Sequence, residues 1–112
     1  MIITTKKTYS IDEIKELKKQ FEVYIKTVID IERKVCSAGM DRHFEGEQIL
    51  IKQGSKQSNI WGGGIDLETK EIDFNSFINI RPRDNNLKNE IQSEEIKKEY
   101  KKLTEYFLKK IL

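Results

Sequence analysis

Residues 11–38 read IDEIKELKKQFEVYIKTVIDIERKVCSA, and this stretch decides the fold of the chain. At about 100° per residue, its apolar side chains fall in one arc of a helical wheel and most charged side chains fill the other side. Gly39 follows where a helix C-cap belongs. The pattern predicts one long helix over residues 11–38, or two helices with a break near residues 20–22. The β-branched run Val28-Ile29-Asp30-Ile31 favours a strand instead, although period-2 alternation fits it less well.

The start of this helix carries a local signal. Ser10 followed three residues later by Glu13 is a capping box, so the helix is predicted to begin at Ile11. Before it, residues 2–5 are short and β-branched and could form a strand.

Strands and a second helix are predicted after Gly39. The predicted strands cover residues 40–53, 60–67 and 72–81, and the turns between them cover residues 54–59 and 68–71. Pro82 ends the last strand, and Ser93 caps a C-terminal helix with an apolar stripe. The order (β)-α-β-β-β-α predicts an α+β fold, in which a three- to four-stranded antiparallel meander packs against the long N-terminal helix and the C-terminal helix.

Length and composition limit the possible functions. Residues 1–112 are expected to form a single domain. Lys and Arg number 21 and Asp and Glu number 19, so the net charge of +2 excludes a protein that works by bulk positive charge. The single cysteine, Cys36, excludes an internal disulfide. The chain has no signal-peptide pattern and no run of about 18 apolar residues, so we expect a cytoplasmic protein without a membrane segment.

One carboxylate interrupts the apolar arc of residues 11–38. Glu32 lies near the centre of the arc, between Val28 and Cys36, where a charge is costly unless it finds a partner. Glu32 is therefore a functional group, one half of a structural ion pair, or a side chain that reaches the edge of the core.

The first predicted strand carries possible partners for Glu32. His43, Glu45 and Glu47 stand two residues apart and would point to one face of a strand. The rise along the helix and along the strand places Glu32 and His43 at about the same level. His43 and Glu32 are therefore candidate catalytic acid/base residues, and His43, Glu45 and Glu47 are candidate ligands of a divalent metal ion. The alternative is a lone histidine satisfied by a neighbouring carboxylate.

A second polar group lies on the strand predicted over residues 72–81. Asn79 and Arg81 share one of its faces, and Arg81 could pair with a carboxylate or hold an anionic ligand bidentately. These residues either meet His43 at an edge of the sheet or form a separate polar patch. Trp61 is either a wall of a ligand pocket or an aromatic anchor of the core.

The lysines of the C-terminal helix form three pairs, Lys97-Lys98, Lys101-Lys102 and Lys109-Lys110. Glutamates interleave with them, and the chain carries no aromatic stacking motif for RNA. Such a pattern is more often a solvated helix face than an interface, so nucleic acid is not expected as a partner.

Four segments occur in order along the chain: Val28-Ile29-Asp30-Ile31-Glu32, His43-x-Glu45-x-Glu47, Gly54-Ser55-Lys56-Gln57-x-x-x-Trp61-Gly62 and Ile78-Asn79-Ile80-Arg81-Pro82. Together they resemble a family of small prokaryotic proteins catalogued only as a domain of unknown function, and the resemblance covers nearly the whole chain. Members of that family carry His-x-Asp-x-Glu and a Gly-Asn-Arg-Ser-like run after Arg-Pro. Glu45 and residues 84–88 depart from this pattern. The resemblance names no activity, but it points to the same polar residues.

Two functions follow as hypotheses. The first is a protein that binds a small molecule or a divalent metal, extending to a small hydrolase-like enzyme, through a polar site of Glu, His and Arg. The alternative is a non-catalytic interaction module in which the polar residues are structural. Such a module would meet a protein partner or a second copy of itself through a surface that includes Trp61 or Phe77.

Overall fold

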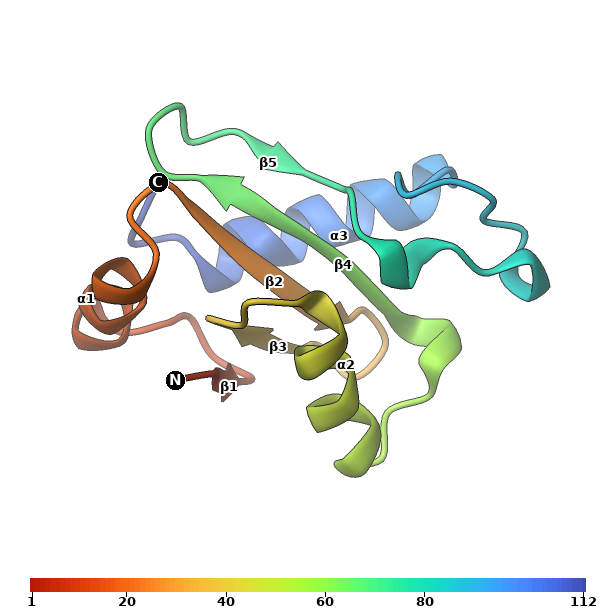
Figure 1. Ribbon diagram of the computed structural model, residues 1–112, viewed down its shortest axis with the longest axis horizontal. Coiled ribbons are helices and arrows are strands. Elements are labelled where there is room, and N and C mark those ends of the chain that lie inside the picture. The colour runs from red at the N-terminus through yellow and green to blue at the C-terminus, as the bar shows by residue number, and fades with distance from the viewer.

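A computed structural model describes residues 1–112 (Figure 1). Its main elements are β1 (Ile3–Thr5), α1 (Ile11–Gln20), β2 (Tyr24–Asp30), β3 (Val35–Ala38), α2 (His43–Lys52), β4 (Ile60–Asp66), β5 (Ile72–Asp73) and α3 (Glu94–Phe107). Short 3-10 helices are η1 (Gln57–Asn59), η2 (Phe77–Asn79) and η3 (Pro82–Asp84). The strands form one five-stranded antiparallel sheet in the order β1-β3-β2-β4-β5. The predicted α+β class with an antiparallel sheet is confirmed.

The prediction of one long helix over residues 11–38 is wrong beyond Gln20. α1 begins at Ile11 with the predicted capping box, in which the Glu13 backbone N–H donates to Ser10 Oγ at 3.1 Å. Residues 24–38 then form the hairpin β2–β3. Both strands are almost wholly buried, so they lack the polar alternation that marks a half-exposed strand. Their β-branched residues suit a sheet better than a helix.

Two further predicted strands differ from the structure. Residues 40–53 contain the helix α2, and the strand predicted over residues 72–81 ends at Asp73. α2 packs closely on β2 at Gly46, where a Cβ atom would lie 3.0 Å from Cγ2 of Val28. The observed order is therefore β-α-β-β-α-β-β-α, with α2 inserted between the two hairpins.

Helices cover both faces of the sheet. In Figure 1, α2 lies in front of the strands and α3 lies behind them. The larger core lies on the side of α1 and α3 and includes Tyr9, Leu17, Ile29, Trp61, Tyr100 and Phe107. The smaller core, under α2, consists of Val28, Val35, Met40, Leu50 and Ile60. None of the helices has the length and hydrophobicity needed to span a bilayer.

Glycines in β4 allow side chains to approach the sheet closely. A Cβ atom at Gly62 would lie 2.7 Å from Cβ of Ser76 and 3.0 Å from Cδ2 of His43. On the opposite face, a Cβ atom at Gly63 would lie 2.9 Å from the hydroxyl of Tyr100. Gly62 therefore lets His43 and Ser76 pack against the strand on the α2 side, and Gly63 lets Tyr100 approach from the other side.

Candidate functional site

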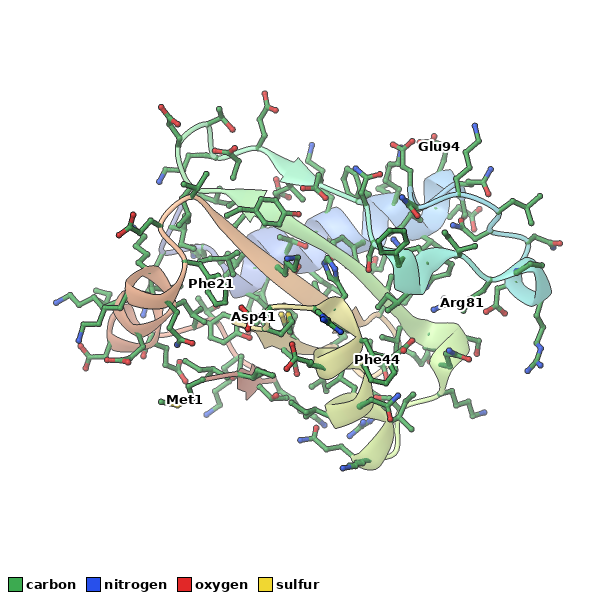
Figure 2. The ribbon with its side chains drawn as sticks, viewed as in Figure 1. Met1, Phe21, Asp41, Phe44, Arg81 and Glu94 are labelled. Carbon is green, nitrogen blue, oxygen red and sulfur yellow. The ribbon has the colours of Figure 1, made fainter.

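A cleft of about 410 Å³ opens at the start of α2. Its lining residues are Lys26, Asp41, Arg42, His43, Phe44, Ser76, Phe77 and Ile78. One wall is the first turn of α2 and the other is the segment 76–78, which includes the start of η2. Asp41 and Phe44 are labelled beside the start of α2 in Figure 2. Among the residues proposed from the sequence for a catalytic, metal or ligand site, His43 alone lines this cleft; Phe77, proposed for an interaction surface, lines it as well.

The first turn of α2 presents main-chain donors without partners. The Arg42 backbone N–H donates to Oε1 of Glu45 at 2.9 Å, so Glu45 caps the helix. The backbone N–H groups of His43 and Phe44 donate to no group of the chain. The first N–H groups of a helix carry its partial positive charge, so this end of the cleft favours an anion or another hydrogen-bond acceptor.

His43 is held against β4. Its Nε2 lies 2.7 Å from the carbonyl oxygen of Gly63, which can only accept, so Nε2 carries the hydrogen. Burial lowers the pKa of His43; the hydrogen bond to Gly63 acts in the opposite sense, and Lys26 lowers the pKa further. The imidazole is therefore neutral at neutral pH, and its Nδ1 is free of hydrogen and able to accept.

The cleft combines positive charge with apolar surface. Lys26 Nζ donates to the carbonyl oxygen of Asp41 at 2.8 Å, which holds the ammonium group beside α2. Neither Lys26 nor Arg42 forms an ion pair, although Asp41 also lines the cleft. Phe44 is 58% exposed and Phe77 is 81% exposed, so both offer aromatic surface to a bound molecule.

The expectation of a buried carboxylate at Glu32 is wrong. Glu32 lies exposed in the turn between β2 and β3, where its backbone N–H donates to Oδ1 of Asp30 at 2.9 Å. The helical wheel misplaced Glu32 because the chain leaves a strand at this point and does not continue a helix. Glu32 does not line the cleft that contains His43.

The carboxylates of α2 do not gather around His43. Because α2 is a helix, residues two apart point about 200° away from each other and do not share a face. Glu45 is exposed and caps the helix, whereas Glu47 is buried and accepts from Nε2 of Gln57 at 3.4 Å. No group of three or more His, Cys, Asp or Glu side chains is arranged to hold a metal ion. The strand on which the metal hypothesis depended is not formed.

Asn79 takes the place of a strand beside β4. β5 pairs only with Gly64 and Ile65, which leaves Gly62 without a strand partner on that side. Oδ1 of Asn79 accepts from the Gly62 backbone N–H, and Nδ2 donates to the Gly62 carbonyl oxygen, both at 2.9 Å. Nδ2 also donates to two further carbonyl oxygens. Asn79 is fully buried, so its amide is committed to the main chain.

Arg81 binds the main chain at the start of β4, beside the contacts of Asn79. Its Nη1 donates to the carbonyl oxygen of Ile60 at 2.7 Å, and its Nε donates to Oδ2 of Asp84 at 2.8 Å. The guanidinium lies 4.2 Å from the ring centroid of Trp61, a cation–π contact. Burial lowers the pKa of Arg81, and Asp84 raises it. In this structure Arg81, Trp61 and Asn79 hold the loop after β5 onto β4, and they do not share the cleft with His43.

Sequence reasoning missed most of the cleft. The missed residues are Lys26, Asp41, Arg42, Phe44, Ser76 and Ile78, whereas Phe77 was expected on an interaction surface. One signal was present, because Arg42 and Glu45 stand three apart like Ser10 and Glu13 at the start of α1. Arg is not a preferred N-cap residue, which hid the start of α2. The exposed Phe44 left no local signal, since residue type does not encode exposure.

Comparison with protein families gives a match over nearly the whole chain. A family model described as "Protein of unknown function (DUF5674)" matches residues 1–107. The resemblance to a family catalogued as a domain of unknown function is thereby confirmed. Searches of curated proteins and of solved structures gave no match.

Proposed function

We propose that this chain, which belongs to the family described as "Protein of unknown function (DUF5674)", binds a small organic molecule in the cleft at the start of α2. The ligand has an anionic head group and an apolar or aromatic body. The observation that carries this proposal is the meeting, in one cleft, of unpaired N–H groups of a helix N-terminus with exposed phenylalanines. Concave sites with mostly apolar walls and a few convergent polar groups are typical of small-molecule binding.

The anionic head group follows from the donors. The N–H groups of His43 and Phe44 need an acceptor, and the side chains of Lys26 and Arg42 add positive charge that no carboxylate of the chain neutralises by an ion pair. A carboxylate or phosphate would satisfy both requirements. A neutral His43 fits this site, because Nδ1 could accept from a hydroxyl or amide of the ligand.

The apolar body follows from the rim. Phe44 and Phe77 stand on opposite walls, and Ile78 adds apolar surface between the start of η2 and α2. Covering exposed aromatic surface contributes about 25 cal/mol per Å² of area removed from water. A planar ring held between the two walls would gain this stabilisation.

Amide NMR shifts test the proposal. Titration with benzoate, phenylacetate and indole-3-acetate is expected to shift the His43 and Phe44 amide signals, whereas benzyl alcohol binds more weakly because it lacks the charge. Phe77→Ala and Arg42→Gln are expected to weaken binding by roughly tenfold or more, the factor that about 1.4 kcal/mol represents. Leu87→Ala and Arg83→Gln, exposed residues outside the cleft, serve as matched controls. Shifts elsewhere, or equal losses in the controls, would contradict the proposal.

A second candidate function is self-association. Phe44, Phe77 and Ile80 are exposed large apolar side chains on or beside the cleft, which supports the expected homodimer through Phe77. Trp61 is buried and is not part of this surface. Sedimentation equilibrium at high protein concentration tests the idea. A dimer that Phe77→Ala dissociates and Leu87→Ala leaves intact supports it, and a monomer at every concentration rejects it.

We also propose that the protein is located in the cytoplasm. It is supported by the single cysteine, whose thiol is buried and forms no disulfide. Burial raises the pKa of Cys36 to about 12, so the thiol stays protonated and is not a nucleophile. Fractionation of cells that express the protein tests the location.

A further inference from the structure

A second cavity, of about 320 Å³, lies where the C-terminal half of α3 meets the turn between β2 and β3 and the segment after β1. Its lining residues are Lys6, Lys34, Lys102, Leu103 and Tyr106. The lysines come from separate segments of the chain, and no carboxylate lines the cavity. None of these lysines forms an ion pair. Their positive charges are therefore gathered without a counter-charge.

The main chain holds two of these lysines in place. The segment after Lys6 is tied to the end of α3, because Thr8 Oγ1 donates to the Tyr106 carbonyl oxygen at 2.9 Å and the Tyr9 backbone N–H donates to that of Phe107 at 2.9 Å. Lys34 closes the β2–β3 turn with φ of 55°, a left-handed conformation that costs a lysine energy. The positions of the lysines are thus set by tertiary structure and are not a property of one helix face.

A cavity at the other hairpin provides a contrast. It has a volume of about 310 Å³ and is lined by Lys70, Glu71, Ile72, Phe74, Lys101, Glu105 and Leu112. Lys70 occupies the same turn position as Lys34, with φ of 66°. There, carboxylates share the lining with the lysines. The mixture of lysines and carboxylates at the β4–β5 hairpin is typical of a solvated helix face. The cavity of Lys6, Lys34 and Lys102 differs from it, because no carboxylate lines that cavity.

Tyr106 adds a flat apolar wall to the basic cavity. It is 47% exposed, and its ring lies 5.2 Å from that of Phe107 in an edge-to-face arrangement, so the core orients it. Leu103 lies one turn earlier on the same helix face. Ammonium groups suit phosphate oxygens as point charges, and an exposed tyrosine ring suits a stacked planar group.

We propose that this cavity binds a small phosphorylated molecule that carries a planar aromatic group, the chemical class of the nucleotides. The phosphates would lie among Lys6, Lys34 and Lys102, and the planar group would stack on Tyr106. This site lies on the opposite side of the sheet from the cleft at α2, and the inference is independent of the function proposed for that cleft.

Isothermal titration of the full chain with ADP at low salt tests the proposal. Wild-type protein is expected to bind ADP more tightly than pyrophosphate and not to bind adenosine. Lys34→Gln and Lys102→Gln are each expected to weaken binding by roughly tenfold, since a hydrogen bond to a charged group contributes about that factor. Lys70→Gln and Lys101→Gln, in the cavity at the β4–β5 hairpin, are matched controls and are expected to leave the affinity within about twofold.

Tyr106→Leu tests the contribution of the planar group separately from that of the phosphates. It removes the stacking surface at an exposed position, so the fold is retained, and the affinity for ADP is expected to fall to that for pyrophosphate. The proposal is overturned if ADP does not bind wild-type protein, or if the control lysines matter as much as Lys34 and Lys102. It is also overturned if a single-stranded oligonucleotide binds through these lysines while ADP does not, because the ligand would then be a nucleic acid.

Discussion

The two β-hairpins of this protein turn through the same five-residue pattern, Asp-x-Glu-x-Lys. Asp30–Lys34 joins β2 to β3, and Asp66–Lys70 joins β4 to β5. In each, the lysine N–H donates to the aspartate carbonyl oxygen at 2.8 Å. In each, Oδ1 of the aspartate accepts from the second and third backbone N–H groups that follow. Both lysines are left-handed.

The difference between the turns lies in their surroundings. Asp30 is fully buried, its Oδ2 has no hydrogen-bond partner, and its turn leads into the buried strand β3. Asp66 lies at the opposite end of the β2–β4 pair, and its turn leads into the two-residue strand β5. The same local chemistry therefore supports the centre of the sheet at one end and an exposed edge at the other.

Removing the aspartate side chain gives the largest expected difference between the turns. Asp30→Ala removes a fully buried acceptor from two backbone N–H groups that are partly shielded from water, so we expect a loss of about 2 kcal/mol in the free energy of unfolding. Asp66→Ala is expected to lose less, because water can replace the carboxylate at an exposed turn. Urea denaturation measures both. Asp30→Asn keeps an acceptor and should retain most of the stability, whereas equal losses at the two aspartates would contradict the comparison.

Replacing Lys34 or Lys70 by glycine is expected to stabilise the protein, because each lysine has a strained left-handed backbone conformation. Lys34→Gly and Lys70→Gly each remove a steric cost of about 1–2 kcal/mol and add a smaller cost in chain entropy, for a net gain of about 0.5–1 kcal/mol. Thermal and urea denaturation should give similar gains at both positions, since the backbone geometry is the same. A loss of stability at either position would mean that its side chain makes a contact that outweighs the strain.

The repeated pattern also shows what could be predicted from the sequence. Residues 68–71 were predicted as a hairpin turn, and the structure places the β4–β5 turn there. The same Asp-x-Glu-x-Lys pattern at residues 30–34 falls within the predicted helix, because the apolar residues on both sides recur at helical spacing. Strands buried on both faces carry no alternation, so hydrophobic periodicity could not separate the two structures. Comparison of the two Asp-x-Glu-x-Lys segments would have revealed the first turn.

The candidate site was predictable only in part. Local signals gave the starts of α1 and α3, where Ser10 and Ser93 cap helices as predicted. His43 lines a cleft, but its role as a catalytic or metal-binding residue stays a prediction, and the strand that was to align it with Glu45 and Glu47 is a helix. The other wall of the cleft follows β5 along the chain, and no local pattern reveals which segments meet across a sheet.

Protonation of Asp66 in the exposed β4–β5 turn is expected to be measurable from the amide signals of that turn. Main-chain hydrogen bonds from Thr69 and Glu68 lower the pKa of Asp66 below its ordinary value of 3.8. A lowered pKa means that the carboxylate stabilises the fold above pH 3.8 and that this contribution is lost as the pH falls through the pKa of the folded state. The Glu68 and Thr69 amide signals should therefore titrate with a midpoint below 3.8. A midpoint at or above that value would contradict these hydrogen bonds.

The prediction with the smallest expected effect concerns Glu32. It tests whether this residue lies in an exposed turn, as in the structure, or on the buried face of a helix over residues 11–38. Glu32 and Glu68 occupy the same exposed position in their turns, so Glu32→Gln and Glu68→Gln are each expected to change the free energy of unfolding by less than about 0.5 kcal/mol. A buried carboxylate facing His43 would behave differently, since its neutralisation would change the stability and move the pKa of the histidine. The chain has one histidine, so an NMR titration reports the pKa of His43 without ambiguity. If Glu32→Gln shifts that pKa and Glu68→Gln does not, the two turns are not equivalent and the carboxylate of Glu32 reaches the cleft after all.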